Sequence, residues 1–122
     1  MKIPAIHHVQ LAIPRGDEPE ARRYYGELLG LKEVPKPENL QRRGGVWFST
    51  GSLDLHLGVD PSFGPATKAH VAFEVADLQL IRDRIEAAGF EIVEDEPLPG
   101  HDRFYTVDPF GNRLEFLSPF PK

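Results

Sequence analysis

Residues 103–117 read Arg-Phe-Tyr-Thr-Val-Asp-Pro-Phe-Gly-Asn-Arg-Leu-Glu-Phe-Leu, two strand-like runs joined by a turn. Proline after aspartate and glycine before asparagine are typical of a tight turn, so we interpret Asp108–Asn112 as structural. The flanking runs alternate in polarity, which predicts two-faced strands at Arg103–Val107 and Arg113–Leu117. Glu115 is then a polar residue on a strand whose opposite face is apolar.

The same order of elements occurs twice along the chain. Alternating polarity predicts a first strand at Ile6–Ile13 and an equivalent one at Lys68–Val75. An amphipathic helix with an aspartate at its start follows each, and a glycine, Gly30 or Gly89, ends it. Three strand-like runs then follow each helix: Leu31–Val34, Val46–Thr50 and Leu53–Val59 in the first half, and Phe90–Glu94, Arg103–Val107 and Arg113–Leu117 in the second.

This repetition predicts an α+β fold made of two tandem β-α-β-β-β modules. The modules span about residues 5–59 and about residues 68–119 of a single domain, residues 1–122. The breaker-rich stretch Gly58–Thr67 is the expected linker. Duplicated units usually pair to enclose a cleft, so residues at equivalent positions of the two halves are the first candidates for chemistry.

Composition excludes several classes of function. The 122 residues include no cysteine, which excludes disulfides, thiolate metal sites and a cysteine nucleophile. A net charge of −5 argues against binding to nucleic acid or to an anionic membrane, since both need concentrated positive charge. No apolar run approaches the roughly 18 residues of a membrane span. We therefore expect a soluble, cytoplasmic protein.

Four polar residues stand at equivalent places in the two halves. His8 and His70 lie on the first predicted strands, and His56 and Glu115 on the last. Burying such groups costs several kcal/mol unless something satisfies them. A divalent metal does so, because neutral imidazole and carboxylate are ligands that it prefers. The alternative is a satisfied polar network with a structural or regulatory role.

Two further histidines are not expected to be ligands. Strand alternation places His7 on the face opposite His8, where it is structural or exposed. His101 lies in the predicted loop 97–102, where it could line an entrance.

The chain resembles the vicinal oxygen chelate superfamily, which includes glyoxalase I, bleomycin-resistance proteins, extradiol dioxygenases and fosfomycin-resistance enzymes. The resemblance covers nearly the whole chain, and the Asp-Pro-x-Gly-Asn turn before the last strand is its most specific part. Four segments carry it: Ile6–Ile13, Tyr24–Leu31, Ala69–Phe73 and Phe104–Glu115.

The resemblance implies a metal site at His8, His56, His70 and Glu115. Extradiol enzymes hold Fe(II), and fosfomycin-resistance enzymes Mn(II), at the places of His8, His70 and Glu115. Glyoxalase I and methylmalonyl-CoA epimerase add a fourth ligand, Glu or Gln, at the place of His56. A histidine there departs from both patterns and leaves Glu115 as the expected catalytic base. The expected cofactor is a divalent metal ion: Zn, Ni, Fe, Mn or Co.

The expected function is that of a metal-dependent enzyme which chelates a small oxygenated substrate through adjacent oxygens, with isomerase or lyase proton transfer favoured. Extradiol-type dioxygenation and fosfomycin-type thiol transfer are alternatives on the same site. Non-catalytic sequestration of a drug or metabolite, as in bleomycin resistance, is an alternative of another class. The resemblance also implies a homodimer, in which His8 and His56 of one chain share a metal with the partner subunit's His70 and Glu115.

Five residues are candidates for contact with the substrate. The resemblance turns Arg103 and Tyr105 inward, and Tyr105 is a candidate catalytic hydrogen-bond partner or an interior packing residue. Phe48, at the equivalent place in the first half, is expected to form an apolar wall, with Trp47 pointing into the helix-packed core. Arg42 and Arg43 are expected either to hold a substrate carboxylate or phosphate or to be solvated surface residues.

Overall fold

A computed structural model describes residues 1–121 and divides the chain into two units. The first unit is Met1–Pro65, and the second begins at Ala66, inside the expected linker. Each unit combines one sheet with helical segments, so the α+β prediction is confirmed. No helix in the described part of the chain is long and apolar enough to cross a bilayer.

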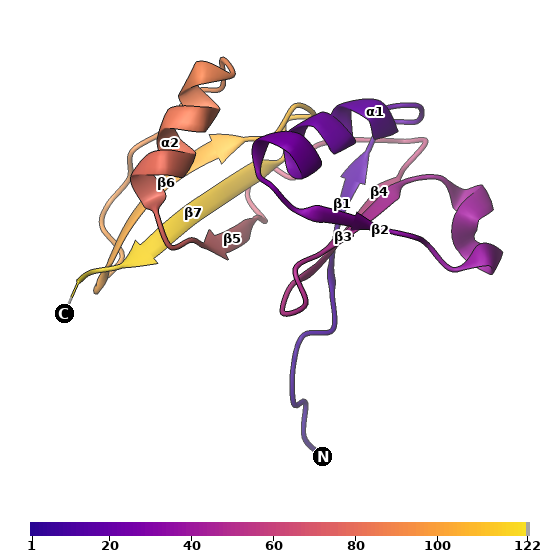
Figure 1. Cartoon of the computed structure of the whole chain (residues 1–122), viewed down its shortest axis with the longest axis horizontal. Coiled ribbons are helices and arrows are strands. Elements are labelled where there is room, and N and C mark those ends of the chain that lie inside the picture. The colour runs from indigo at the N-terminus through magenta and orange to yellow at the C-terminus, as the bar shows by residue number, and fades with distance from the viewer. Residues whose placement is uncertain (122) are drawn as a thin grey trace. The chain divides into compact units, whose positions relative to one another are not determined.

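The first unit has a four-stranded sheet in the order β1-β4-β3-β2 (Figure 1). β1 is parallel to β4, and the other neighbours are antiparallel. The strands are β1 (Val9–Ile13), β2 (Lys32–Val34), β3 (Val46–Ser49) and β4 (Asp54–Val59). The helical segments are α1 (Glu18–Ala21), which continues into η1 (Arg22–Leu28), and the short η2 (Glu38–Arg43) between β2 and β3.

The helical segment α1–η1 forms where its sequence was amphipathic, but its start differs from the prediction. Asp17 makes no side-chain capping hydrogen bond, and the helix instead begins with a proline in its first turn. Asp17 therefore stands at the helix start, as its sequence position indicated, but does not cap the helix, and the proline in the first turn needs no capping partner for its missing N–H. Ala21, Tyr24 and Tyr25 are buried on the face toward the sheet.

The second unit has a three-stranded sheet in the order β5-β7-β6. β5 (Val71–Glu74) is parallel to β7 (Arg113–Pro119), and β6 (His101–Val107) is antiparallel to it. Between β5 and β6, α2 (Leu78–Ala87) is capped by Asp77, whose side chain accepts a hydrogen bond from the Leu80 N–H at 3.1 Å. The core of this unit is formed mainly by Phe73, Ile85, Phe104, Leu114 and Phe116.

The predicted strand Phe90–Glu94 is reduced to a single bridge between Val93 and Tyr105. The two residues exchange backbone hydrogen bonds of 2.7 and 2.9 Å, which keep the segment at the edge of the sheet. The acidic run Glu94–Glu96 and then Pro97 follow directly. Clustered like charges and a proline disfavour continued pairing, so the strand stops after one bridge.

The turn Asp108–Asn112 is a closed hydrogen-bond network. The Asp108 carboxylate accepts from the N–H groups of Phe110 (2.9 Å) and Asn112 (2.8 Å) and from the Asn112 side-chain amide (3.0 Å). The Asn112 side-chain oxygen in turn accepts from the Ala66 N–H at 3.0 Å. Both side chains are buried, so the turn attaches the first residue of the second unit to the β6–β7 hairpin.

We predict that Asn112→Ala lowers the free energy of unfolding by about 2 kcal/mol, because it removes the side-chain acceptor of the Ala66 N–H and the side-chain donor to the second Asp108 oxygen. Urea denaturation measures the change. The control is Asn39→Ala, the same substitution at an exposed position of η2, which should change stability by less than about 0.5 kcal/mol. Equal losses in the two variants would contradict a specific role for the network.

Candidate functional site

In the first unit, His8 and His56 lie side by side. β1 and β4 are paired with Gln10 opposite His56, so His8 lies two residues before the partner of His56. The two imidazole rings stack with centroids 4.3 Å apart. Across β4, the Trp47 indole of β3 is stacked on His56 at 3.8 Å with an interplanar angle of 1°.

The environment of His56 favours a neutral imidazole. The side chain is buried, and burial lowers its pKa below the usual value, with a further lowering by the charge of His8. Asp54 opposes this effect more weakly. A neutral ring keeps one nitrogen lone pair free at neutral pH, which is the form that a metal ligand requires.

In the second unit, His70 and Glu115 form the equivalent pair. Ala72 of β5 is opposite Glu115 of β7, so His70 again lies two residues before the partner of the last-strand residue. His70 Nε2 is 2.9 Å from Glu115 Oε1, and His70 Nδ1 is 3.0 Å from the Lys68 carbonyl oxygen. A carbonyl at Nδ1 orients the ring and directs Nε2 toward the carboxylate, an arrangement common in metal-binding histidines.

Glu115 is the centre of a cluster on the open face of the second sheet. The Arg103 guanidinium donates to the Tyr105 hydroxyl at 3.0 Å and to Glu115 Oε2 at 3.4 Å. Its other nitrogens donate to the Glu96 carbonyl, which fixes the side chain. Burial, and then the negative charge of Glu115, raise the pKa of Tyr105, so its phenol stays protonated. The structure thus brings together Arg103, Tyr105, Glu115 and His70.

The prediction that Phe48 lines the pocket and Trp47 faces the core is wrong. Phe48 is opposite Leu55 and is 1% exposed, packed near Tyr25 on the helix-covered face. Trp47 is opposite His56 and shares its face. Alternation showed that the two aromatics face opposite sides, but the strand register decides which side carries the histidines. A correct register for the β3–β4 hairpin, with Trp47 opposite His56, would have identified Trp47 as a residue of the histidine face.

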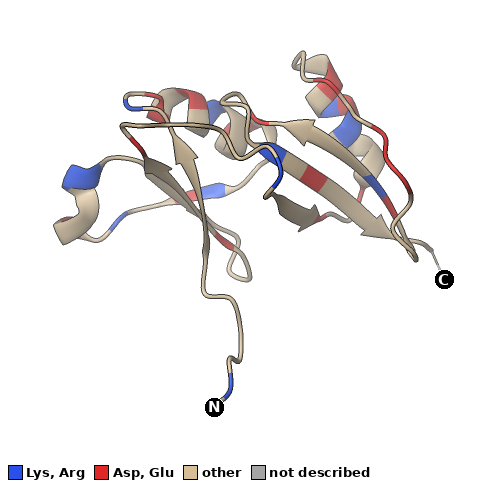
Figure 2. Cartoon of the chain, turned by 180° about the vertical axis from the view of Figure 1, so that it is seen from behind, with Lys and Arg blue, Asp and Glu red and all other residues tan. Residues whose placement is uncertain are grey.

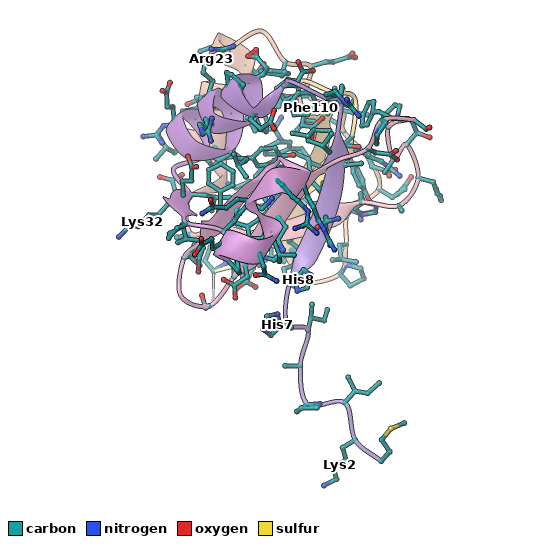
Figure 3. All side chains as sticks on the ribbon, turned by 90° about the vertical axis from the view of Figure 1, so that its right-hand side faces the viewer. Lys2, His7, His8, Arg23, Lys32 and Phe110 are labelled. Carbon is teal, nitrogen blue, oxygen red and sulfur yellow. The ribbon has the colours of Figure 1, made fainter. Side chains whose placement is uncertain are left out.

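The prediction that His7 faces away from His8 is also wrong. Their Nδ1 atoms are 3.0 Å apart, and Figure 3 shows both residues where the extended N-terminal segment meets the body of the unit. β1 begins only at Val9, so strand alternation does not govern the two histidines before it.

The first unit contains a cavity of about 610 Å³ beside the imidazole pair. The side chains that matter for its chemistry are His7, His8, Lys36, Arg43, Trp47 and His56. Of the two predicted arginines, Arg43 lines the cavity and Arg42 does not. Lys36 was missed because nothing in its local sequence distinguishes it from other surface lysines.

The segment that carries Lys36 and Arg43 is tied to the rest of the unit at its end. Lys36 donates to the Gly44 carbonyl, and Glu18 accepts from the Gly45 N–H at 3.0 Å. Gly45 has φ +85°, and a Cβ there would lie 2.2 Å from the Leu57 carbonyl oxygen, so only glycine fits. These contacts hold the end of η2 against β4.

We predict that Glu18→Gln destabilises the protein by about 1 kcal/mol at pH 7, because Glu18 is a charged acceptor for Gly45. This hydrogen bond holds the pKa of Glu18 below its usual value. The contribution of Glu18 to stability is therefore complete above the usual pKa of a glutamate and is lost as the pH falls through the lower pKa of the folded state.

Urea denaturation at pH 7 and at pH 3 tests this, with Glu38→Gln, an exposed residue on η2, as the control for loss of charge. A difference between wild type and Glu18→Gln that stays constant across both pH values would contradict the assignment.

The four predicted metal ligands therefore form two pairs, one in each unit. Across residues 1–121, no group of three or more histidine, cysteine, aspartate or glutamate side chains is arranged to hold a metal ion. The donor types fit a borderline divalent cation, since three imidazoles and one carboxylate are suitable ligands. Each unit by itself supplies half of such a set.

The comparisons with known proteins agree with the fold. The sequence model of the Glyoxalase/Bleomycin resistance protein/Dioxygenase superfamily matches residues 5–116. Among solved structures, a protein from Bacillus anthracis assigned to the glyoxalase family is 45% identical, with 98% of each chain covered and a TM-score of 0.92. No curated protein matches the chain.

Two more distant structures share the fold alone. A glyoxalase/dioxygenase from Nostoc punctiforme is 20% identical, with 97% of this chain and 92% of that chain covered and a TM-score of 0.76. The fosfomycin resistance protein FosX from Listeria monocytogenes is 16% identical, with 99% and 95% covered and a TM-score of 0.73. The resemblance drawn from the sequence segments is confirmed.

Proposed function

This chain belongs to the glyoxalase/bleomycin resistance protein/dioxygenase superfamily, and from that membership we propose that it is a metal-dependent enzyme. The proposed reaction is an isomerase- or lyase-type proton transfer on a small substrate bound through two adjacent oxygens. One observation carries the proposal: His8 with His56, and His70 with Glu115, occupy matching register positions in the two units.

The proposed site combines one pair from each of two chains. Members of this superfamily typically dimerise and bind small molecules. In the proposed homodimer, His8 and His56 of one chain and the partner subunit's His70 and Glu115 hold one divalent metal. This arrangement accounts for a donor set that is divided evenly between two units, since the described residues of neither unit include three donors arranged to hold a metal ion.

The metal, when bound, supplies Lewis-acid stabilisation of negative charge that develops on the substrate oxygens. Side chains of the protein itself transfer the proton. In the proposed mechanism, a Glu115 carboxylate oxygen takes a proton from the carbon beside a substrate carbonyl and returns it to the neighbouring atom. Arg103 keeps Glu115 and the Tyr105 hydroxyl in position, and the protonated phenol donates a hydrogen bond to a substrate oxygen.

We predict that the purified protein contains near-stoichiometric divalent metal and that either His56→Ala or Glu115→Ala removes it. Mass-spectrometric metal analysis of untagged protein is the measurement, and His101→Ala is the control because its ring is hydrogen-bonded to the Pro99 carbonyl and is not one of the four proposed ligands. If no ion binds, even after reconstitution, the metal-dependent proposal is wrong and a non-catalytic binding protein is the remaining function.

Complementation tests whether the site is shared between chains. His56→Ala breaks only the first pair and Glu115→Ala only the second, so a mixed dimer of the two variants has one intact site and one doubly damaged site. After unfolding and refolding of an equal mixture, we predict recovery of about a quarter of the wild-type metal content, from random assortment of chains in a two-fold dimer. Metal content that stays at the level of the separate variants would show that each site lies within one chain.

A further inference from the structure

We propose that Lys36 and Arg43 form a binding subsite for an anionic group of the substrate, a carboxylate or a phosphonate, in the cavity of the first unit. This inference rests on the proposed function in taking that cavity as the substrate site. It goes further by naming the substrate class: a small organic anion with an apolar body.

The two cations come from one segment. Lys36 follows β2, and Arg43 is the last residue of η2, the short helix between β2 and β3. Figure 1 shows η2 projecting beside the sheet of the first unit, and Figure 2 shows that this helix carries basic residues. Both side chains line the same cavity as His56, while the adjacent Arg42 does not.

The donors of both side chains are available to a ligand. Lys36 is half-buried and uses one donor on the Gly44 carbonyl, and an ammonium group has three. Glu18, the carboxylate whose pKa Lys36 helps to lower, is already engaged by the Gly45 N–H. Within the described residues, neither Lys36 nor Arg43 has a carboxylate within 4.0 Å.

The balance of charge in the cavity is positive. Asp54 is the acidic residue among its lining side chains, against two permanent cations and three histidines. Charge-assisted hydrogen bonds to an oxyanion are stronger than those to neutral groups, and an arginine fork can bind two oxygens at once. An anion therefore gains more from this lining than a neutral ligand of the same shape.

The remaining lining is apolar and fits an organic ligand. Trp47 offers a flat aromatic surface beside His56, and aliphatic side chains of Val34, Leu40 and Val59 complete the lining. The volume of about 610 Å³ suits a small molecule. The contacts of Gly44 and Gly45 hold the Lys36 ammonium and the backbone that follows Arg43 in place before a ligand arrives.

Trp47 is the chain's only tryptophan, so its fluorescence reports directly on this cavity. The experiment titrates the metal-free full-length protein, in chelator, with phenylphosphonate, phenylacetate and the neutral phenylacetamide. We expect saturable binding of an anion at least about tenfold tighter than binding of phenylacetamide, weakened by added salt. Comparison of the phenylphosphonate and phenylacetate titrations shows which oxyanion the subsite prefers.

Matched variants assign the effect to the cations. Arg43→Met should weaken anion binding about tenfold, Arg43→Lys should weaken it less because the positive charge remains without the two-oxygen fork, and Arg42→Met should leave it within about twofold. Lys36→Met should also weaken it, and thermal melting shows whether the loop contact to Gly44 was lost. Anion affinity that equals the amide's, or that is unchanged in Arg43→Met, overturns the proposal, as does the absence of saturable binding.

Metal analysis of the same variants separates the two proposals. Arg43→Met should keep the wild-type metal content, because Arg43 is not a metal ligand. Anion binding without any metal uptake would overturn the proposed enzyme but support the subsite. Metal uptake without charge-dependent anion binding would overturn the subsite alone.

Discussion

The parallel pairing of the first and last strands of each unit is the constraint on which the rest of the structure depends. β1 pairs with β4 so that Gln10 faces His56, and β5 pairs with β7 so that Ala72 faces Glu115. Parallel neighbours cannot be joined by a tight turn, so a helix and the antiparallel strands lie between them in sequence. A slip of one residue in either register would move His56 or Glu115 to the helix-covered face.

In each sheet, the buried apolar residues of one face fix the strands that carry the polar residues on the opposite face. Leu114 and Phe116 flank Glu115 and are buried against the helix side, as Leu55 and Leu57 are around His56. Burying a carboxylate or an imidazole is costly unless the group has partners. Arg103 and His70 are those partners for Glu115. Because the four candidate ligands lie on or beside paired strands, the backbone fixes their spacing better than a loop could.

The two units differ in what they offer a substrate. The first carries the cavity of about 610 Å³, the stacked rings of Trp47 and His56, and two cations on the segment between β2 and β3. The second carries the carboxylate, with a phenol and a guanidinium held against it. In the proposed enzyme, the two units have different roles: the first unit binds and orients an anionic substrate, and Glu115 of the second unit transfers the proton. The two units share a framework of paired first and last strands and differ in the side chains at equivalent positions.

The sequence by itself determined the α+β class, the twofold repetition and the strand positions of His56, Tyr105 and Glu115, because alternation and helical periodicity are local properties of the chain. The tertiary structure decided the features that depend on contacts between distant parts of the chain. The pairing of β3 with β4 put Trp47, not Phe48, beside the histidines. The start of β1 at Val9 left His7 free to join His8, although alternation had separated them. The contacts that hold the end of the β2–β3 segment against β4 brought Lys36 and Arg43 into one cavity, since a segment without a regular period takes its place from the contacts it makes.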